Sequence, residues 1–182
     1  MVVAPYLDTL LLLMVTAAAV KDVESRRIPN RLLAAGMGGA LVLHLLSPQP
    51  LAGLLAWAGG AATGLALFLP FYLVRGMAAG DVKMMAAVGA FAGSGDALRI
   101  AILAWCAGGV MALAVIVFKG RLRLVLASLW AIVRPTLLRL PRGAMPGAAG
   151  GQPGAGSIPY GVAIAAGTIA LLAGRYADRP LL

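Results

Sequence analysis

Long apolar segments constrain the fold of this chain more than any other feature of its sequence. A helix needs about 20 apolar residues to cross the hydrocarbon core of a bilayer. Of the 182 residues, 62% are hydrophobic and 12% are charged, whereas about a quarter of the residues of soluble domains are charged. The sequence therefore predicts an all-α, polytopic membrane bundle that forms a single domain over residues 1–182. We place about six transmembrane helices, at residues 3–21, 32–47, 51–74, 76–95, 97–118 and 158–175.

The positions of the basic residues indicate how this bundle is oriented. The chain has 15 Lys and Arg residues, and all but Arg99, Arg175 and Arg179 fall on the side reached after the first, third and fifth segments. Basic residues beside membrane spans stay cytoplasmic, so both chain ends should face outward. The net charge of +9 is thus a topology signal, and we expect no nucleic-acid partner.

One sizeable extramembrane stretch, residues 119–142, is expected to form an amphipathic helix in the cytoplasmic interface, among anionic head groups. Leucines recur on one face at helical spacing, arginines fall on the other, and Pro135 interrupts the helix. A solvated basic linker is the alternative. Residues 143–157 are rich in Gly, Ala and Pro and are expected to be a flexible loop.

An aspartate, Asp81, falls in the segment 76–85 at the edge of the hydrocarbon or inside it. An ionisable group in such a place is costly and is by default a functional-site hypothesis. Gly80 and the two alanines before it have little side-chain bulk, which would let another backbone approach the carboxyl. The alternative is that Asp81 caps a helix or pairs with Lys83.

A second aspartate, Asp22, lies where the first span reaches the cytoplasmic side. Pro29 disfavours helix at the residue before it, and Asn30 is well suited to cap the next helix. The first span runs inward and the fourth runs outward, so parity places Asp22 and Asp81 at one depth. Two carboxyls in a low-dielectric pocket cannot both ionise easily, so one would hold a proton. Such a pair supplies a general base and a general acid together, as in aspartic proteases.

The other chemically active side chains are weaker candidates. Glu24 lies beside Arg26 and Arg27, which favours a solvated ion pair. His44 has no second ligand of metal-binding type nearby, so we expect a hydrogen-bonded helix histidine and no metal site. Cys106 is the single cysteine, which excludes an internal disulfide and a zinc site of several thiolates. We expect it to be a small buried hydrophobe.

Three motifs together resemble the type IV prepilin peptidases, polytopic aspartic proteases of the GxGD type. They are Asp22 with Arg27-Ile28-Pro29-Asn30, Gly80-Asp81-Val82-Lys83, and the segment 158–165 with Pro159-Tyr160-Gly161. They stand in the order and spacing of that family over nearly the whole chain. The resemblance implies that Asp22 and Asp81 are the catalytic pair and that no cofactor is needed. It also implies that other residues lie near the site: Gly80, Lys83, Arg27, Pro29, Asn30, Pro159, Tyr160 and Gly161.

The chain departs from the family pattern at two points. Ala78 stands where the family motif has its first glycine, which removes some backbone freedom. Full-length members carry an N-terminal cytoplasmic loop with paired CxxC motifs and also methylate the new pilin N-terminus. That loop is absent here, and Cys106 cannot replace it. The chain therefore resembles the short, protease-only form similar to those serving Flp-type (tight-adherence) pili, and we expect cleavage without N-methylation.

The resemblance implies a prepilin substrate, with a short basic leader, usually a glycine before the cut, and then an apolar helix in the bilayer. Such a cut lies at the cytoplasmic interface, the depth expected for Asp22 and Asp81. We therefore predict a multi-pass enzyme of the bacterial inner membrane whose active site faces the cytoplasm and whose basic residues contact anionic lipid. The alternative is a proton- or cation-coupled transporter or channel component that uses the two aspartates. The absence of a visible inverted repeat argues against it.

Overall fold

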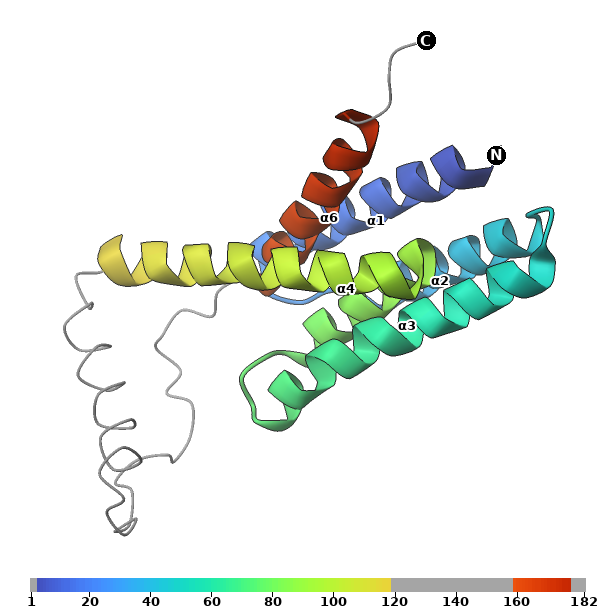
Figure 1. Cartoon of the computed structure of the whole chain (residues 1–182). Coiled ribbons are helices and arrows are strands. Elements are labelled where there is room, and N and C mark those ends of the chain that lie inside the picture. Colours follow the sequence, from blue (N-terminus) through green and yellow to red (C-terminus); the bar gives the residue numbers. More distant parts are fainter. Residues whose placement is uncertain (1–2, 119–158, 178–182) are drawn as a thin grey trace, which may run out of the picture. The chain divides into compact units, whose positions relative to one another are not determined.

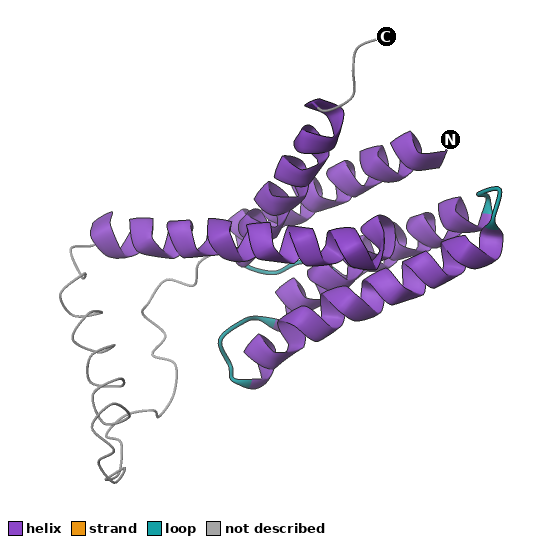
Figure 2. Cartoon of the chain, viewed as in Figure 1, coloured by secondary structure: helices purple, strands orange, loops and turns teal. Residues whose placement is uncertain are grey.

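The computed structural model describes residues 3–118 and 159–177, and every regular element within these residues is a helix (Figure 2). Four of the helices are long and apolar enough to cross a membrane, so the described part of the chain is all-helical, as predicted, and consistent with a multi-pass membrane protein. The remaining helix, α2, has 16 residues. Figure 1 labels the elements: α1 (Val3–Ser25), α2 (Asn30–Leu45), α3 (Pro50–Leu73), α4 (Ala79–Phe118) and α6 (Tyr160–Ala177).

The chain divides into two compact units, residues 1–108 with 159–182 and residues 109–158. All of the side-chain contacts described below belong to the first unit. The amphipathic helix expected at 119–142 and the loop expected at 143–157 lie outside the described residues.

α4 contains two helical parts that meet at Gly93, where φ is 77° and ψ is 172°. This region of backbone conformation is open essentially only to glycine. The two spans expected at 76–95 and 97–118 correspond to the two parts of α4. The expected total of six spans is not confirmed, because only four helices of the described part have the length and hydropathy of a span.

Glycines bring the backbones of α3 and α4 into contact. A Cβ atom at Gly60 would overlap the carbonyl of Gly89, and one at Gly89 would overlap the carbonyl of Gly60. Gly64 approaches the carbonyl of Met85 in the same way. Small residues four apart, such as Gly60 and Gly64, permit such contacts between membrane helices.

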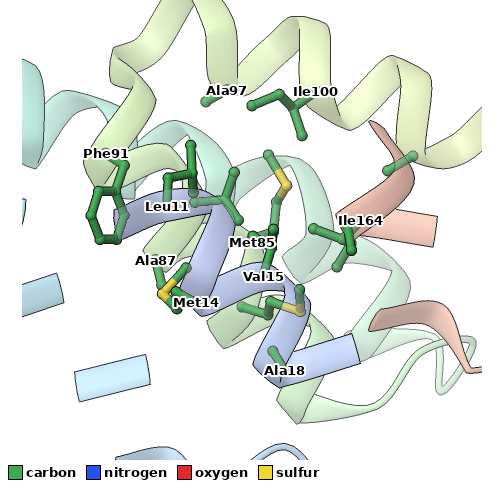
Figure 3. Close-up of a cluster of buried hydrophobic side chains, with 14 of the residues drawn as sticks. Leu11, Met14, Val15, Ala18, Met85, Ala87, Phe91, Ala97, Ile100 and Ile164 are labelled. Atoms are coloured by element: carbon green, nitrogen blue, oxygen red, sulfur yellow. The ribbon is translucent and has the colours of Figure 1, made fainter. Parts of the chain in front are cut away.

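The apolar core joins α1, both parts of α4 and α6 (Figure 3). α1 also packs against α2 and α6, and α2 packs against α3. The labelled core residues in Figure 3 are Leu11, Met14, Val15 and Ala18 of α1, Met85, Ala87, Phe91, Ala97 and Ile100 of α4, and Ile164 of α6. The core therefore holds together the same three helices that carry the candidate site.

The side chains of His44 and Cys106 test what the sequence predicted about their burial. His44 is buried, and its Nε2 lies 3.1 Å from the carbonyl oxygen of Ala90, so it is the hydrogen-bonded helix histidine that the sequence predicted. Cys106 is exposed, and the expectation that it is buried was wrong. The buried face of this part of α4 runs through Ala101, Ala104 and Gly108. Cys106 lies on the opposite face. A segment that is apolar on all sides gives no periodic signal of which face is buried.

The contact between α3 and α4 gives a test with a neighbouring control. We expect Gly60→Ala to reduce the stability of the detergent-solubilised protein by about 1–3 kcal/mol, because a methyl group there must push two backbones apart. A Cβ at Gly59 meets no atom within 4 Å, so Gly59→Ala should cause no loss. Thermal unfolding of both variants measures the difference, and equal stability would contradict the backbone contact.

Candidate active site

Asp22 lies in the last turn of α1, which ends in a defined cap. Arg26 is the first residue outside the helix, and its φ of 54° lies in the left-handed region. Its N–H donates to the carbonyl of Asp22 at 3.0 Å. This is the left-handed cap that commonly ends helices, usually with glycine. Ser25 Oγ also donates to the carbonyl of Lys21 at 2.9 Å. These bonds fix the backbone from which the Asp22 carboxyl projects.

Asp81 lies in the first turn of α4, and it shares a cavity with Asp22. Their side chains come from different helices, yet the two residues are only 7% and 6% exposed. The cavity has a volume of about 330 Å³. Its other lining residues are Arg26, Arg27, Ile28, Asn30, Ala78, Ala79, Gly80 and Lys83. The structure thus brings together the two acids that parity placed at one depth, with cationic side chains around them.

The third helix of the site, α6, begins against Asp22. The N–H of Gly161 donates to Asp22 Oδ2 at 2.8 Å. The first N–H groups of a helix have no partner within it, and the positive end of the helix dipole attracts negative charge. The Asp22 carboxylate therefore takes the place of a capping side chain for α6, although it comes from α1.

Gly161 is the glycine that permits close approach to a carboxyl. A Cβ at this position would lie 2.8 Å from Asp22 Oδ2 and 3.1 Å from Asp22 Cβ. The sequence suggested this role for Gly80, but a Cβ at Gly80 would meet only the Ile28 side chain, at 3.7–3.8 Å, an ordinary contact distance. The close approach is made at the start of α6.

Lys83 and Asn30 connect α4 to α2 at the cavity. Lys83 Nζ donates to Asn30 Oδ1 at 3.3 Å. No ion pair joins Lys83 to Asp81 in the described part of the chain, so the pairing considered from the sequence is not found.

The expectation that Asn30 caps α2 was wrong. Pro29 holds the cap position, with φ −64° and ψ 123°, and no side chain caps this helix. The carbonyl of Pro29 accepts the N–H of Leu32 at 3.1 Å. Because proline fixes the extended residue at position 29, Asn30 becomes the first helical residue. Its side chain is then available to Lys83.

Tyr160, between Pro159 and Gly161, packs into an aromatic cluster that sequence reasoning did not find. Its ring meets the edge of Phe68 at a centroid distance of 6.0 Å, and Phe68 stacks on Trp105 at 5.9 Å. A Cβ at Gly108 would overlap the Tyr160 ring. These contacts join three helices, so no spacing along the chain could reveal them. The cluster supports the turn of α6 that binds Asp22.

Glu24 behaves as the sequence predicted for a solvated acid, although its partner differs. It pairs with Lys21 at 2.8 Å, and its side chain is 55% exposed. Among the described residues, no three His, Cys, Asp or Glu side chains are grouped so that they could hold a metal ion.

These features define a class: a polytopic helical membrane protein with two buried carboxyls that share one cavity at the ends of helices. The sequence matches the type IV leader peptidase family over residues 9–113, a region that contains both Asp22 and Asp81. The chain belongs to this family, as its resemblance to the prepilin peptidases implied, and is a leader peptidase-type protein. Comparison with curated proteins and with solved structures finds no match.

The contact at Gly161 predicts a large effect from one methyl group. We expect Gly161→Ala to lower the peptidase kcat by about 10- to 100-fold, because the added Cβ must displace the Asp22 carboxyl, and small misplacements of reacting groups have costs of this order. Gly174→Ala on the same helix is the control, since a Cβ there meets no atom within 4 Å. Cleavage kinetics of the two purified variants provide the comparison, and equal kcat values would contradict the steric argument.

Proposed function

We propose that this protein is an aspartyl endopeptidase that removes the basic leader of prepilin-like proteins, with Asp22 and Asp81 as its catalytic pair. The observation that carries the proposal is the burial of both carboxyls in one cavity. Membership of the type IV leader peptidase family supports the reaction class and the kind of substrate.

The proposed reaction is hydrolysis by a base and an acid acting together. The Gly161 N–H and the start of α6 stabilise negative charge on Asp22, so Asp22 is assigned to take a proton from the attacking water. Asp81, holding a proton, polarises the scissile carbonyl. The water oxygen bonds to the carbonyl carbon, the C–N bond then breaks, and a carboxyl group returns a proton to the leaving amine. Water is consumed, and the two products are the leader acid and the mature amine.

The substrate proposal follows from the position of the site at the ends of helices. A prepilin has its cut between a basic leader and an apolar membrane helix, so the scissile bond lies where helices leave the bilayer. We propose that this end of the bundle faces the cytoplasm in the bacterial inner membrane. A glycine before the cut lowers the cost of extending the peptide. The basic residues on this face of the bundle do not attract a basic leader, and we assign those outside the cavity to anionic lipid head groups instead.

The remaining motif residues are assigned to positioning. Arg27 and Lys83 line the cavity, as do Gly80 and Asn30. Pro29 precedes α2, and Pro159 precedes α6. Tyr160 is held by the aromatic cluster. These residues line the cavity or lie at the starts of α2 and α6, whose first residues include Asn30 and Gly161.

The catalytic pair is tested by substitutions that keep shape and remove charge. We expect Asp22→Asn and Asp81→Asn each to lower cleavage of a co-expressed prepilin by more than about 1,000-fold, because each removes a proton-transfer group. Glu24→Gln is the matched control, two residues from Asp22 but exposed and paired only with Lys21 in the described contacts. Prepilin size on a gel reports cleavage, and membrane accumulation reports folding. Normal processing by either aspartate variant would refute the proposed pair.

Cleavage without methylation is a separate prediction. We expect the mature pilin produced by this protein alone to carry an unmodified N-terminal amine, even when a methyl donor is supplied. Mass spectrometry of the N-terminal peptide measures this directly. A methylated N-terminus with no other enzyme present would overturn the protease-only proposal and leave the peptidase proposal standing.

A further inference from the structure

We propose that Arg175 is a positioning residue: it fixes the register of α6 against α1 and thereby keeps the Gly161 N–H on the Asp22 carboxylate. The inference rests on the proposed function for its effect on cleavage, and on geometry alone for its effect on the Gly161 hydrogen bond. Arg175 lies in the last turn of α6, at the end opposite Gly161.

Arg175 contacts acids on two other helices. Its Nη1 lies 3.5 Å from Asp8 Oδ1 on α1, and its Nη2 pairs with Asp96 on α4. The hydroxyl of Tyr176 donates to Asp8 Oδ2 at 3.1 Å. A guanidinium fork can hold two carboxylates in fixed directions, which a lysine cannot do. One side chain of α6 is therefore tied to α1 and to α4 together.

The spacing of the two polar contacts between α1 and α6 is the same in both helices. Asp8 and Asp22 are 14 residues apart in α1, and Gly161 and Arg175 are 14 residues apart in α6. At 1.5 Å per residue this is about 21 Å, or close to four turns, so each helix presents both contacts on one face. α1 and α6 are thus joined at both ends of a shared length, by Asp22–Gly161 and by Asp8–Arg175.

Much of the packing between these two contacts comes from small residues. Besides Ile164, Thr168 and Leu172, the buried residues of α6 are Gly161, Ala163, Ala165 and Gly167, and small residues let membrane helices approach closely. A slip of one residue moves α6 by about 1.5 Å. Such a slip would break the 2.8 Å bond from Gly161 to Asp22. A polar contact at the far end of the helix opposes that slip.

Arg99 at the same end provides a matched control. It also pairs with Asp96, at 3.2 Å, but within its own helix and with 71% of its side chain exposed. The Arg175 side chain is 34% exposed and joins different helices. Exposed pairs within one helix contribute little, so loss of Arg99 should leave the register of α6 unchanged.

The test compares Arg175→Met with Arg99→Met in the full-length purified protein. Exchange of the Gly161 amide hydrogen, followed by NMR with ¹⁵N-glycine labelling, reports the bond to Asp22 without reference to activity. We expect about tenfold faster exchange and about tenfold lower kcat in Arg175→Met, with KM within about twofold, because the catalytic group is displaced while substrate contacts remain. Arg99→Met should match the unchanged protein in all three quantities.

Asp8→Asn, which keeps the Arg175–Asp96 pair, should show a smaller effect in the same direction and serves as the test if Arg175→Met does not fold.

Unchanged Gly161 exchange in folded Arg175→Met and Asp8→Asn would overturn the inference, as would a lower kcat with unchanged exchange. If the unchanged protein does not cleave prepilin, the proposed function fails, and the exchange measurement still decides the role of Arg175.

Discussion

The burial of two carboxyl groups in one cavity is the constraint on which the rest of this structure depends. A buried acid without partners is costly, and two close together repel when both are charged. The structure offsets part of that cost at Asp22 with the Gly161 N–H, and it surrounds the cavity with Arg26, Arg27 and Lys83. The helix that supplies the N–H lies 139 residues further along the chain. Holding these groups together therefore requires the ends of α1, α4 and α6 to meet.

Close backbone packing is how the bundle meets this requirement. Gly60 and Gly89 bring α3 and α4 into contact, and Gly161 lets α6 reach Asp22. Because lipid tails solvate apolar side chains as well as a protein core does, membrane helices gain from such contacts mainly through tight packing. Gly60 and Gly89 thus lie where two backbones meet, and the break at Gly93 separates the part of α4 that carries Asp81 from the part that carries Cys106.

Parity placed Asp22 and Asp81 at one membrane depth, because parity depends only on counting apolar segments and not on where each helix begins. That the two acids form a pair was implied by the resemblance to the prepilin peptidases. Helix ends were less predictable. Asn30 was expected to cap α2, but Pro29 took the cap position, and the difference of one residue changed what the Asn30 side chain contacts. The sequence also did not predict which face of the second part of α4 is buried, because the uniformly apolar run around Cys106 gives no periodic signal. The aromatic cluster of Phe68, Trp105 and Tyr160 depends on contacts among three helices, which no local pattern contains.

The geometry of α1 and α6 links these points to the proposed reaction. A proton transfer needs donor and acceptor within hydrogen-bond reach, whereas small apolar side chains position helices less sharply than that. Polar contacts at both ends of the α1–α6 pair fix the register more precisely. The bond at Gly161 and the ion pair at Arg175 are the same number of residues apart in each helix. Apolar packing then makes the helices associate, and the two polar contacts fix the register of α6 along α1. A peptidase that has to hold a carboxylate at a lipid boundary needs both.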